Sequence, residues 1–214
     1  MKPFFDLVPA DWGGRDRGCL HLYVLPNRQV RDMAVAYQQV FDQRGIDGLS
    51  RQPADHLHIT VQKLLVWRHD LADEQVKALA DTLRIHVARV PAWTAQVGPA
   101  LVAGTSIGLD VTPDQPWQQL RQAVRAAVTE SLGEQALPRD GGAGRPHISL
   151  GYGLTDFDID PHLAAINGLR LGRADLTIDR VVLVAVDQDR TAGAYTWPTP
   201  LAELPLAAAG PGRG

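Results

Sequence analysis

Residues 55–62 read Asp55-His56-Leu57-His58-Ile59-Thr60-Val61-Gln62. The two-residue period of a β-strand puts the apolar residues of this stretch on one face and its polar residues on the other. The same pattern returns in Arg145-Pro146-His147-Ile148-Ser149-Leu150-Gly151. We therefore predict two strands that each carry an imidazole and a hydroxyl on one face, His58 with Thr60 and His147 with Ser149.

The sequence before each of these stretches also repeats. A short alternating strand ends at Pro26 in the first half and at Pro113 in the second, and an amphipathic helix is predicted after each proline. His58 follows the first proline by 32 residues, and His147 follows the second by 34. This near-equal spacing indicates an internal duplication.

The duplication predicts two similar lobes related by approximate two-fold symmetry. The repeats span about residues 20–100 and 105–186 within a single domain at 19–206. The apolar face of each strand should pack under the helices, which leaves the polar faces free to meet across one cleft. Residues 1–18 are expected to form an irregular arm and residues 207–214 a flexible tail.

Periodicity and end signals predict the remaining elements. Asn27, Asp70 and Asp114 are expected to cap three helices, and Asp160 with Pro161 to open a shorter one. Alternation predicts further strands, at residues 20–24, 93–97, 106–111, 174–186 and about 194–199.

Composition limits the classes of function. The net charge of -3 gives no basic signature of tight, non-specific nucleic-acid binding. Cys19 is the single cysteine, which excludes an intramolecular disulfide and fits a reducing compartment. Residues 1–10 lack an apolar core of signal-peptide length, and the apolar run at 181–186 is too short for a membrane span. We therefore expect a cytoplasmic protein with no membrane partner.

Two facing histidines suit in-line displacement at phosphorus. Attack and departure occur on opposite sides of the phosphorus, so one imidazole takes a proton from the nucleophile while the other gives one to the leaving oxygen. A reference pKa of ~6.5 makes both forms of histidine available near neutrality. Thr60 and Ser149 can donate hydrogen bonds to the non-bridging oxygens. This scheme requires no metal ion and no cofactor.

The paired motifs resemble those of the two-histidine (2H) phosphoesterase superfamily, specifically its bacterial 2′-5′ RNA ligase / RNA 2′,3′-cyclic phosphodiesterase branch. The resemblance extends roughly from Leu20 to Pro205. It implies a bilobal α+β fold with two antiparallel sheets and outer helices around a central cleft. It also implies hydrolysis of 2′,3′-cyclic phosphodiester ends to 2′-phosphates, or cleavage and joining of 2′-5′ linkages.

Carried over by position, the resemblance makes His58 and His147 the catalytic histidines and Thr60 and Ser149 the phosphate ligands. The near-neutral charge favours a small cyclic or oligonucleotide phosphodiester over long RNA. No obligate protein partner is implied, and a bilobal chain needs no dimer to complete its cleft.

Three further residues are candidates for substrate contacts. His56 shares the predicted strand face of His58, Arg145 stands beside His147, and Tyr23 should face the cleft from the neighbouring strand. Each also has a structural interpretation, as a residue of the cleft mouth, a solvated arginine and a packed aromatic, respectively.

Two other functions stay open. His56, His58 and His147 could supply three nitrogen ligands to a metal ion, although no carboxylate shares their faces. The cleft could also serve as a non-catalytic nucleotide- or RNA-binding module. The sequence leaves open whether hydrolysis or ligation is the biological reaction, and which histidine is the base.

Overall fold

The structure is a computed structural model that describes residues 1–7, 12, 14–139 and 144–208. Within these residues the chain forms nine strands: β1 (Cys19–Val24), β2 (Ile59–Trp67), β3 (Trp93–Val102), β4 (Ser106–Thr112), β5 (His147–Tyr152), β6 (Ala174–Ile178), β7 (Arg180–Asp189), β8 (Ala194–Thr196) and β9 (Ala202–Pro205). They also form four α-helices, α1 (Arg28–Gln43), α2 (Asp73–Val87), α3 (Asp114–Leu132) and α4 (Asp160–Gly168), and the short 3-10 helices η2 (Ala54–His56), η3 (Arg68–Asp70) and η4 (Glu134–Ala136).

The strands pair in the antiparallel order β6-β3-β4-β5-β2-β1-β7-β8, with β9 beside β7. The two halves of this order meet where β2 pairs with β5 through Ile59 and Ile148. We call β1, β2, β7, β8 and β9 the His58 lobe, and β3 to β6 the His147 lobe. The predicted α+β class is confirmed, with the two lobes of antiparallel strands joined edge to edge into one sheet.

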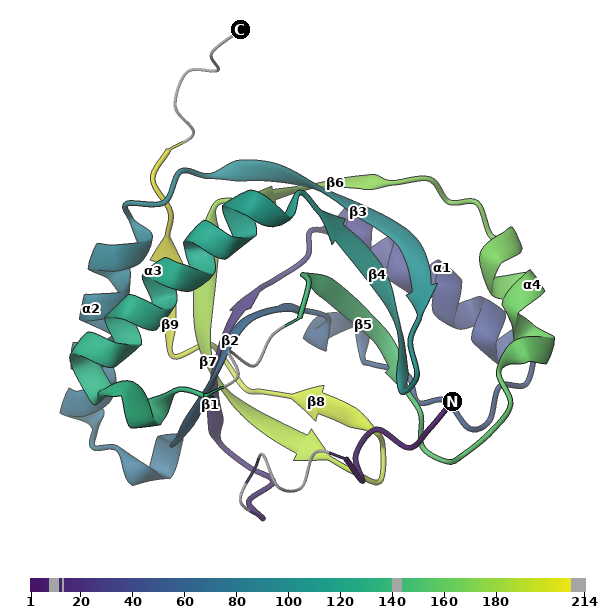
Figure 1. The fold of residues 1–214 in the computed structure, drawn as a ribbon, viewed down its shortest axis with the longest axis horizontal. Coiled ribbons are helices and arrows are strands. Elements are labelled where there is room, and N and C mark those ends of the chain that lie inside the picture. The colour runs from purple at the N-terminus through teal and green to yellow at the C-terminus, as the bar shows by residue number, and fades with distance from the viewer. Residues whose placement is uncertain (8–11, 13, 140–143, 209–214) are drawn as a thin grey trace, which may run out of the picture.

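The helices lie at the two ends of the molecule, with the strands between them (Figure 1). Helix α2 packs on α3 and β9, and α3 also packs on β2, so this pair covers the His58 lobe. Helix α1 packs on β5, β6 and α4 and covers the His147 lobe. Each lobe is therefore built from both sequence repeats, because α1 and β3 of the first repeat serve the His147 lobe while α3 and β7 of the second serve the His58 lobe.

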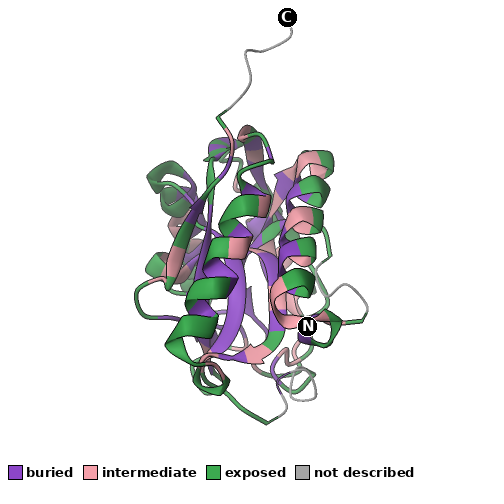
Figure 2. Ribbon diagram, turned by 90° about the vertical axis from the view of Figure 1, so that its left-hand side faces the viewer, coloured by how far each residue is buried: buried purple, intermediate pink, exposed green. Residues whose placement is uncertain are grey.

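The predicted apolar stripes form the core between the helices and the sheet (Figure 2). Helix α3, one of the two predicted amphipathic helices, buries Trp117, Leu120, Val124, Ala127 and Val128. Burying a large apolar side chain stabilises the fold by about 1.5–3 kcal/mol. Asn27 caps α1 as predicted, since its side-chain oxygen accepts from the Val30 N–H at 3.0 Å.

Two element boundaries and one helix cap differ from the predictions. Asp114 does not cap α3, because it is the first residue of the helix, and Pro113 before it has no side chain that can bond to the helix. Helix α2 begins at Asp73, because Asp70 lies in η3 and pairs with Arg15, while the Gln75 side chain accepts from the Ala72 N–H. The predicted strand at 174–186 is two strands, β6 beside β3 and β7 beside β1, which belong to different lobes.

The first polar stretch also begins later than predicted. Strand β2 starts at Ile59, and His56 closes the 3-10 helix η2. The buried Gln52 side chain holds this turn, because its Nε2 donates to the His56 carbonyl at 2.8 Å. The expectation that His56 and His58 share one strand face is therefore wrong.

The N-terminal arm is packed against both lobes. The backbone N–H groups of Lys2 and Phe4 donate to the carbonyls of Gly104 and Gly153 in the His147 lobe, each at 2.8 Å. Trp12 stacks on Tyr195 of the His58 lobe, with ring centroids 5.8 Å apart. At the other end, Ala207 pairs with Pro91, while the rest of the predicted tail beyond residue 208 lies outside the described residues.

Candidate active site

The two histidines line one cavity between the lobes. This cavity has a volume of about 310 Å³, and its wall includes His58, Thr60, His147 and Ser149. Strand β2 carries Thr60 and follows directly from His58, while β5 carries both His147 and Ser149. The structure thus brings together all four residues that the sequence predicts as the catalytic set.

The backbone fixes the orientation of both imidazoles in the same way. The Nδ1 of His58 lies 2.8 Å from the His56 carbonyl oxygen, and the Nδ1 of His147 lies 2.9 Å from the Arg145 carbonyl oxygen. A carbonyl can only accept, so each Nδ1 carries a proton and donates it. In the neutral ring this leaves Nε2 as a proton acceptor, and in the charged ring both nitrogens carry protons.

Each hydroxyl of the site is bonded to a tyrosine. Thr60 hydrogen-bonds with Tyr23, and Ser149 hydrogen-bonds with Tyr152. Burial raises the pKa of Tyr152 to about 12 and that of Tyr23 also well above its usual value, so both phenols keep their protons near neutrality. Each hydroxyl can accept from its protonated phenol when it donates its own proton to an anion.

The His58 side of the cavity is filled with aromatic rings. The Tyr23 ring stacks on the His58 ring with centroids 4.0 Å apart and an interplanar angle of 18°, and Trp197 meets His58 edge-on at 5.3 Å. His58 is 7% exposed, and this burial lowers its pKa to about 4, with a smaller contribution from the charge of His147. The free protein therefore holds His58 as a neutral imidazole at pH 7.

The His147 side is open. His147 is exposed, at the first position of β5. The neighbouring strands explain the difference between the two histidines. In the His58 lobe, Tyr23 of β1 pairs with Thr60, whereas in the His147 lobe Gly108 of β4 has the corresponding position and pairs with Ser149. A glycine has no ring to stack on the neighbouring histidine.

Arg145 lies at the cavity wall and is engaged by two carboxylates. Its Nε donates to Asp114 at 3.1 Å, and its Nη2 lies 3.6 Å from a carboxylate oxygen of Asp110. Its backbone carbonyl orients His147, so the contribution of Arg145 that the structure establishes is a main-chain one.

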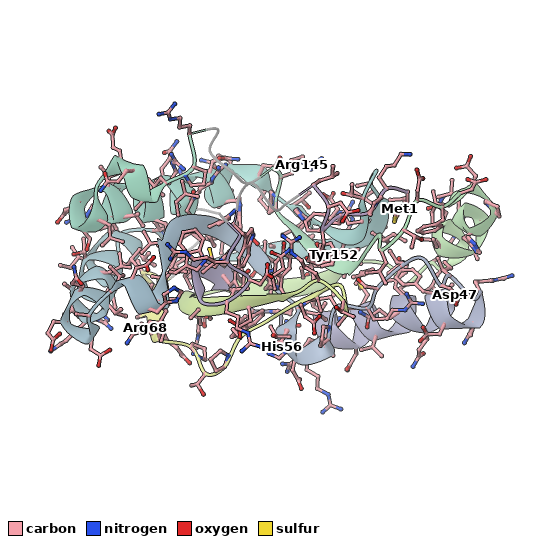
Figure 3. All side chains as sticks on the ribbon, turned by 90° about the horizontal axis from the view of Figure 1, so that it is seen from below. Met1, Asp47, His56, Arg68, Arg145 and Tyr152 are labelled. Atoms are coloured by element: carbon pink, nitrogen blue, oxygen red, sulfur yellow. The ribbon has the colours of Figure 1, made fainter. Side chains whose placement is uncertain are left out.

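Of the other two predicted substrate contacts, Tyr23 lines the cavity, whereas His56 is turned away from it. The Nε2 of His56 lies 3.0 Å from the carbonyl oxygen of Trp197, within hydrogen-bond distance, and its ring meets the Trp197 ring edge-on at 4.7 Å. Figure 3 shows Arg145 and His56 on opposite sides of the central region, with Tyr152 between them. The geometry gives Tyr23 a partner in His58 and Thr60 rather than an open face for a base.

Several residues of the site escape the sequence patterns. Phe4 and Trp12 of the arm line the cavity, although the arm is irregular in sequence and precedes the first repeat. Lys63 also lines it and lies over the Trp12 ring, 5.5 Å from its centroid, because a register shift between β1 and β2 brings Lys63 opposite His21. A regularly alternating strand would have placed Lys63 on the opposite face from Thr60, so strand alternation does not predict Lys63 at the cavity wall.

His21 is, with His58, a second buried histidine at this wall. Its Nδ1 lies 3.1 Å from the Cys19 carbonyl oxygen, which repeats the arrangement of His58. Burial lowers its pKa to about 3, so it stays neutral throughout the physiological range.

The described residues contain no group of three or more His, Cys, Asp or Glu placed to hold a metal ion. His56, one ligand of the alternative metal site, is engaged by the Trp197 carbonyl instead. Among the helices that the structure describes, none has the length and apolar character needed to cross a membrane.

Comparison with known proteins gives a family and a fold. The model of the 2′-5′ RNA ligase superfamily matches residues 28–190. The crystal structure of TT0787 of Thermus thermophilus is similar, with a TM-score of 0.66, 18% identity and coverage of 89% of this chain and 98% of that one. E. coli LigT in apo form has a TM-score of 0.58 and 16% identity, covering 90% of this chain and 99% of that one.

The same E. coli protein has also been solved in complex with 3′-AMP, with a TM-score of 0.57, 17% identity and coverage of 90% of this chain and 99% of that one. A search of curated proteins by sequence found no match.

Proposed function

This chain belongs to the 2′-5′ RNA ligase superfamily, and we propose that it is a metal-independent phosphodiesterase that hydrolyses 2′,3′-cyclic phosphate or 2′-5′ linkages of nucleotides by two-histidine acid–base catalysis. The observation that carries this proposal is the matched pair of imidazoles. His58 and His147 face one cavity, each oriented through Nδ1 by a carbonyl two residues earlier and each followed two residues later by a hydroxyl.

His58 acts as the base in hydrolysis. It is buried and neutral, so its Nε2 can accept the proton of the attacking water. His147 acts as the acid, because its exposed ring can exchange protons with solvent between turnovers. For a 2′,3′-cyclic substrate, the water oxygen bonds to phosphorus, its proton goes to His58, the bond from phosphorus to O3′ breaks, and His147 gives its proton to O3′. The products are a 2′-phosphate and a free 3′-hydroxyl.

The remaining polar groups stabilise the phosphate. Thr60 and Ser149 donate to the non-bridging oxygens, on which charge develops as the water attacks. Lys63 brings a positive charge to the same cavity. The negative charge of a bound phosphodiester raises the pKa of the His58 imidazole, which makes His58 a stronger base in the complex than in the free protein.

Substrate size follows from the cavity. A volume of about 310 Å³ lies at the lower end of the range for small-molecule sites, about 300–1,000 Å³, and fits one nucleotide unit rather than a long RNA. The complexes of the E. coli relative with 3′-AMP, NADP+ and ATP support a nucleotide as the bound group.

Joining of 2′-5′ linkages is the alternative direction of the same chemistry. The acid and base exchange their protonation states when the reaction is reversed, so the same two imidazoles serve a ligase. The direction used depends on the substrates supplied, since the symmetric orientation of the two rings favours neither.

The test is hydrolysis in EDTA of three substrates, a 2′,3′-cyclic mononucleotide, an RNA with a cyclic phosphate end and a 2′-5′ dinucleotide. Wild type, His58→Ala and His147→Ala are compared, with His162→Ala on α4 as a histidine control outside the cavity wall. We expect activity that survives the chelator, persists in the control and is lost in both cavity variants. Activity lost only with EDTA would replace this mechanism with a metal-dependent one, and a wild type that binds these nucleotides without turnover would make the protein a binding module.

A further inference from the structure

A second cavity lies beside His147. It has a volume of about 270 Å³ and sits on the same face of the His147 lobe as the reacting groups. Its lining is mostly apolar around one carboxylate and one guanidinium, and includes Leu101, Ala103, Gly108, Asp110 and His147. It shares Ser106, Arg145 and His147 with the catalytic cavity, so a ligand that extends from one into the other stays beside the same imidazole.

A comparison of corresponding strand positions in the two lobes shows that the second cavity lacks an aromatic ring. In the His58 lobe, one row across the strands reads Val182, Tyr23, Thr60. The matching row of the His147 lobe reads Leu101, Gly108, Ser149. The first row has a ring at its centre that stacks on His58, whereas the second has a glycine beside His147 and an exposed leucine beyond it.

Gly108 cannot be replaced by a ring of the protein. A Cβ at this position would lie 2.9 Å from the backbone oxygen of Ile148, closer than real contacts allow. The place that Tyr23 fills in one lobe is thus kept open in the other by the strand geometry itself.

The proposed reaction places a planar group of the substrate near the open position over Gly108. In the proposed function, on which this inference rests, His147 gives its proton to O3′ as the bond from phosphorus to O3′ breaks, so the ribose that carries O3′ and the base lies on the His147 side of the phosphorus. That side holds the second cavity, while the His58 side is filled by Tyr23 and Trp197.

We propose that the nucleobase of the substrate binds in this second cavity, lying over Gly108 between the His147 ring and Leu101, where it takes the place that Tyr23 has in the other lobe. The contacts are stacking on an imidazole and apolar packing on a leucine that is 51% exposed in the free protein. Base stacking on aromatic side chains changes affinity by about 5- to 150-fold and tolerates every base.

The test compares two substrates that share the five-membered cyclic phosphodiester and differ in the base. One is adenosine 2′,3′-cyclic phosphate, and the other is methyl riboside 2,3-cyclic phosphate, which has a methoxy group in place of the base. Ala103→Trp fills the second cavity from an exposed position, and Ala88→Trp, at the exposed end of α2, is the matched control.

We expect Ala103→Trp to lower kcat/KM for the adenosine substrate by about tenfold or more, mainly through KM, and to leave the base-free substrate within about twofold. Leu101→Ala, which removes one wall without adding bulk, should lower kcat/KM for the adenosine substrate alone by about three- to fivefold. A wild type that turns over both substrates while Ala103→Trp slows both equally, or neither, would overturn the base site and leave the phosphodiesterase intact. A wild type that hydrolyses neither would overturn both.

Discussion

His58 and His147 are held by the same kind of hydrogen bond in opposite surroundings. His58 lies under Tyr23 and Trp197 and is neutral, while His147 stands exposed beside a glycine. The backbone plan of the two lobes is shared, and the side chains of the neighbouring strand differ. In the proposed mechanism, this difference in packing separates the base from the acid, while the backbone orients both imidazoles in the same way.

The largest expected effect comes from removing either imidazole. His58→Ala and His147→Ala should each lower kcat by about 10²–10⁴-fold, measured on a 2′,3′-cyclic nucleotide. A phosphodiester with a p-nitrophenolate leaving group separates the two roles, because such a group departs without a proton. On it His147→Ala should recover most of its activity and His58→Ala should not. Recovery by His58→Ala instead would reverse the assignment of acid and base.

The buried side of the cleft should make the protein sensitive to acid. The pKa values of His58 and His21 are lowered in the folded state, to about 4 and about 3, so the unfolded state binds protons more readily. Their stabilisation is complete above the unfolded pKa of ~6.5 and is lost as the pH falls towards the folded values. Each histidine should account for about 2 kcal/mol lost between pH 8 and pH 5.

His21→Asn isolates one of these two groups, since the amide can still donate to the Cys19 carbonyl but does not titrate. Urea unfolding at both pH values should show the variant losing about 2 kcal/mol less than wild type. Equal losses in the two proteins would show that His21 is not the neutral buried group described here.

The buried side is also supported by the side chain of Gln52. The Gln52 side chain donates to the carbonyls of His56 and Tyr195 and accepts from the Tyr195 N–H, and the His56 carbonyl in turn orients His58. Gln52→Ala should lower kcat by about tenfold with little change in KM, because a loosened imidazole is misplaced in the transition state.

Gln38→Ala is the matched variant. Gln38 is also buried and donates to two backbone carbonyls, those of Gln52 and Leu150, so its removal costs similar stability. We expect its kcat to stay within about twofold of wild type. If both glutamine variants lost kcat alike, Gln52 would be a structural residue and not a positioning one.

The four residues of the proposed catalytic set were predictable as a group, because strand period and spacing both appear in the chain and the structure brings all four to one cavity. His58, Thr60, His147 and Ser149 follow strand alternation, and their spacing from Pro26 and Pro113 repeats. The Asn27 cap of α1 and the amphipathic character of α1 and α3 were also predictable, because they are local properties of the chain.

The site residues that the sequence does not reveal depend on packing between distant parts of the chain. Trp12 reaches the cavity only because the arm folds against both lobes, and Lys63 does so through a register shift that strand alternation does not encode. The sequence also does not show that α1 packs on the His147 lobe and α3 on the His58 lobe. The apolar stripe of an amphipathic helix is the same whichever lobe the helix covers.

The smallest effect expected is on the open side, at Arg145. Asp114 and Asp110 already hold its guanidinium. The backbone carbonyl of residue 145 orients the His147 ring, and this carbonyl remains when the side chain is replaced. Arg145→Ala should therefore raise KM for a cyclic phosphodiester by less than about threefold and leave kcat unchanged. A guanidinium that contacted phosphate as one partner of a charged pair would cost about 10-fold or more on removal. Asp114→Asn sharpens the test, because weakening the competing carboxylate frees the guanidinium and should lower KM, and that gain should vanish when Arg145→Ala is added.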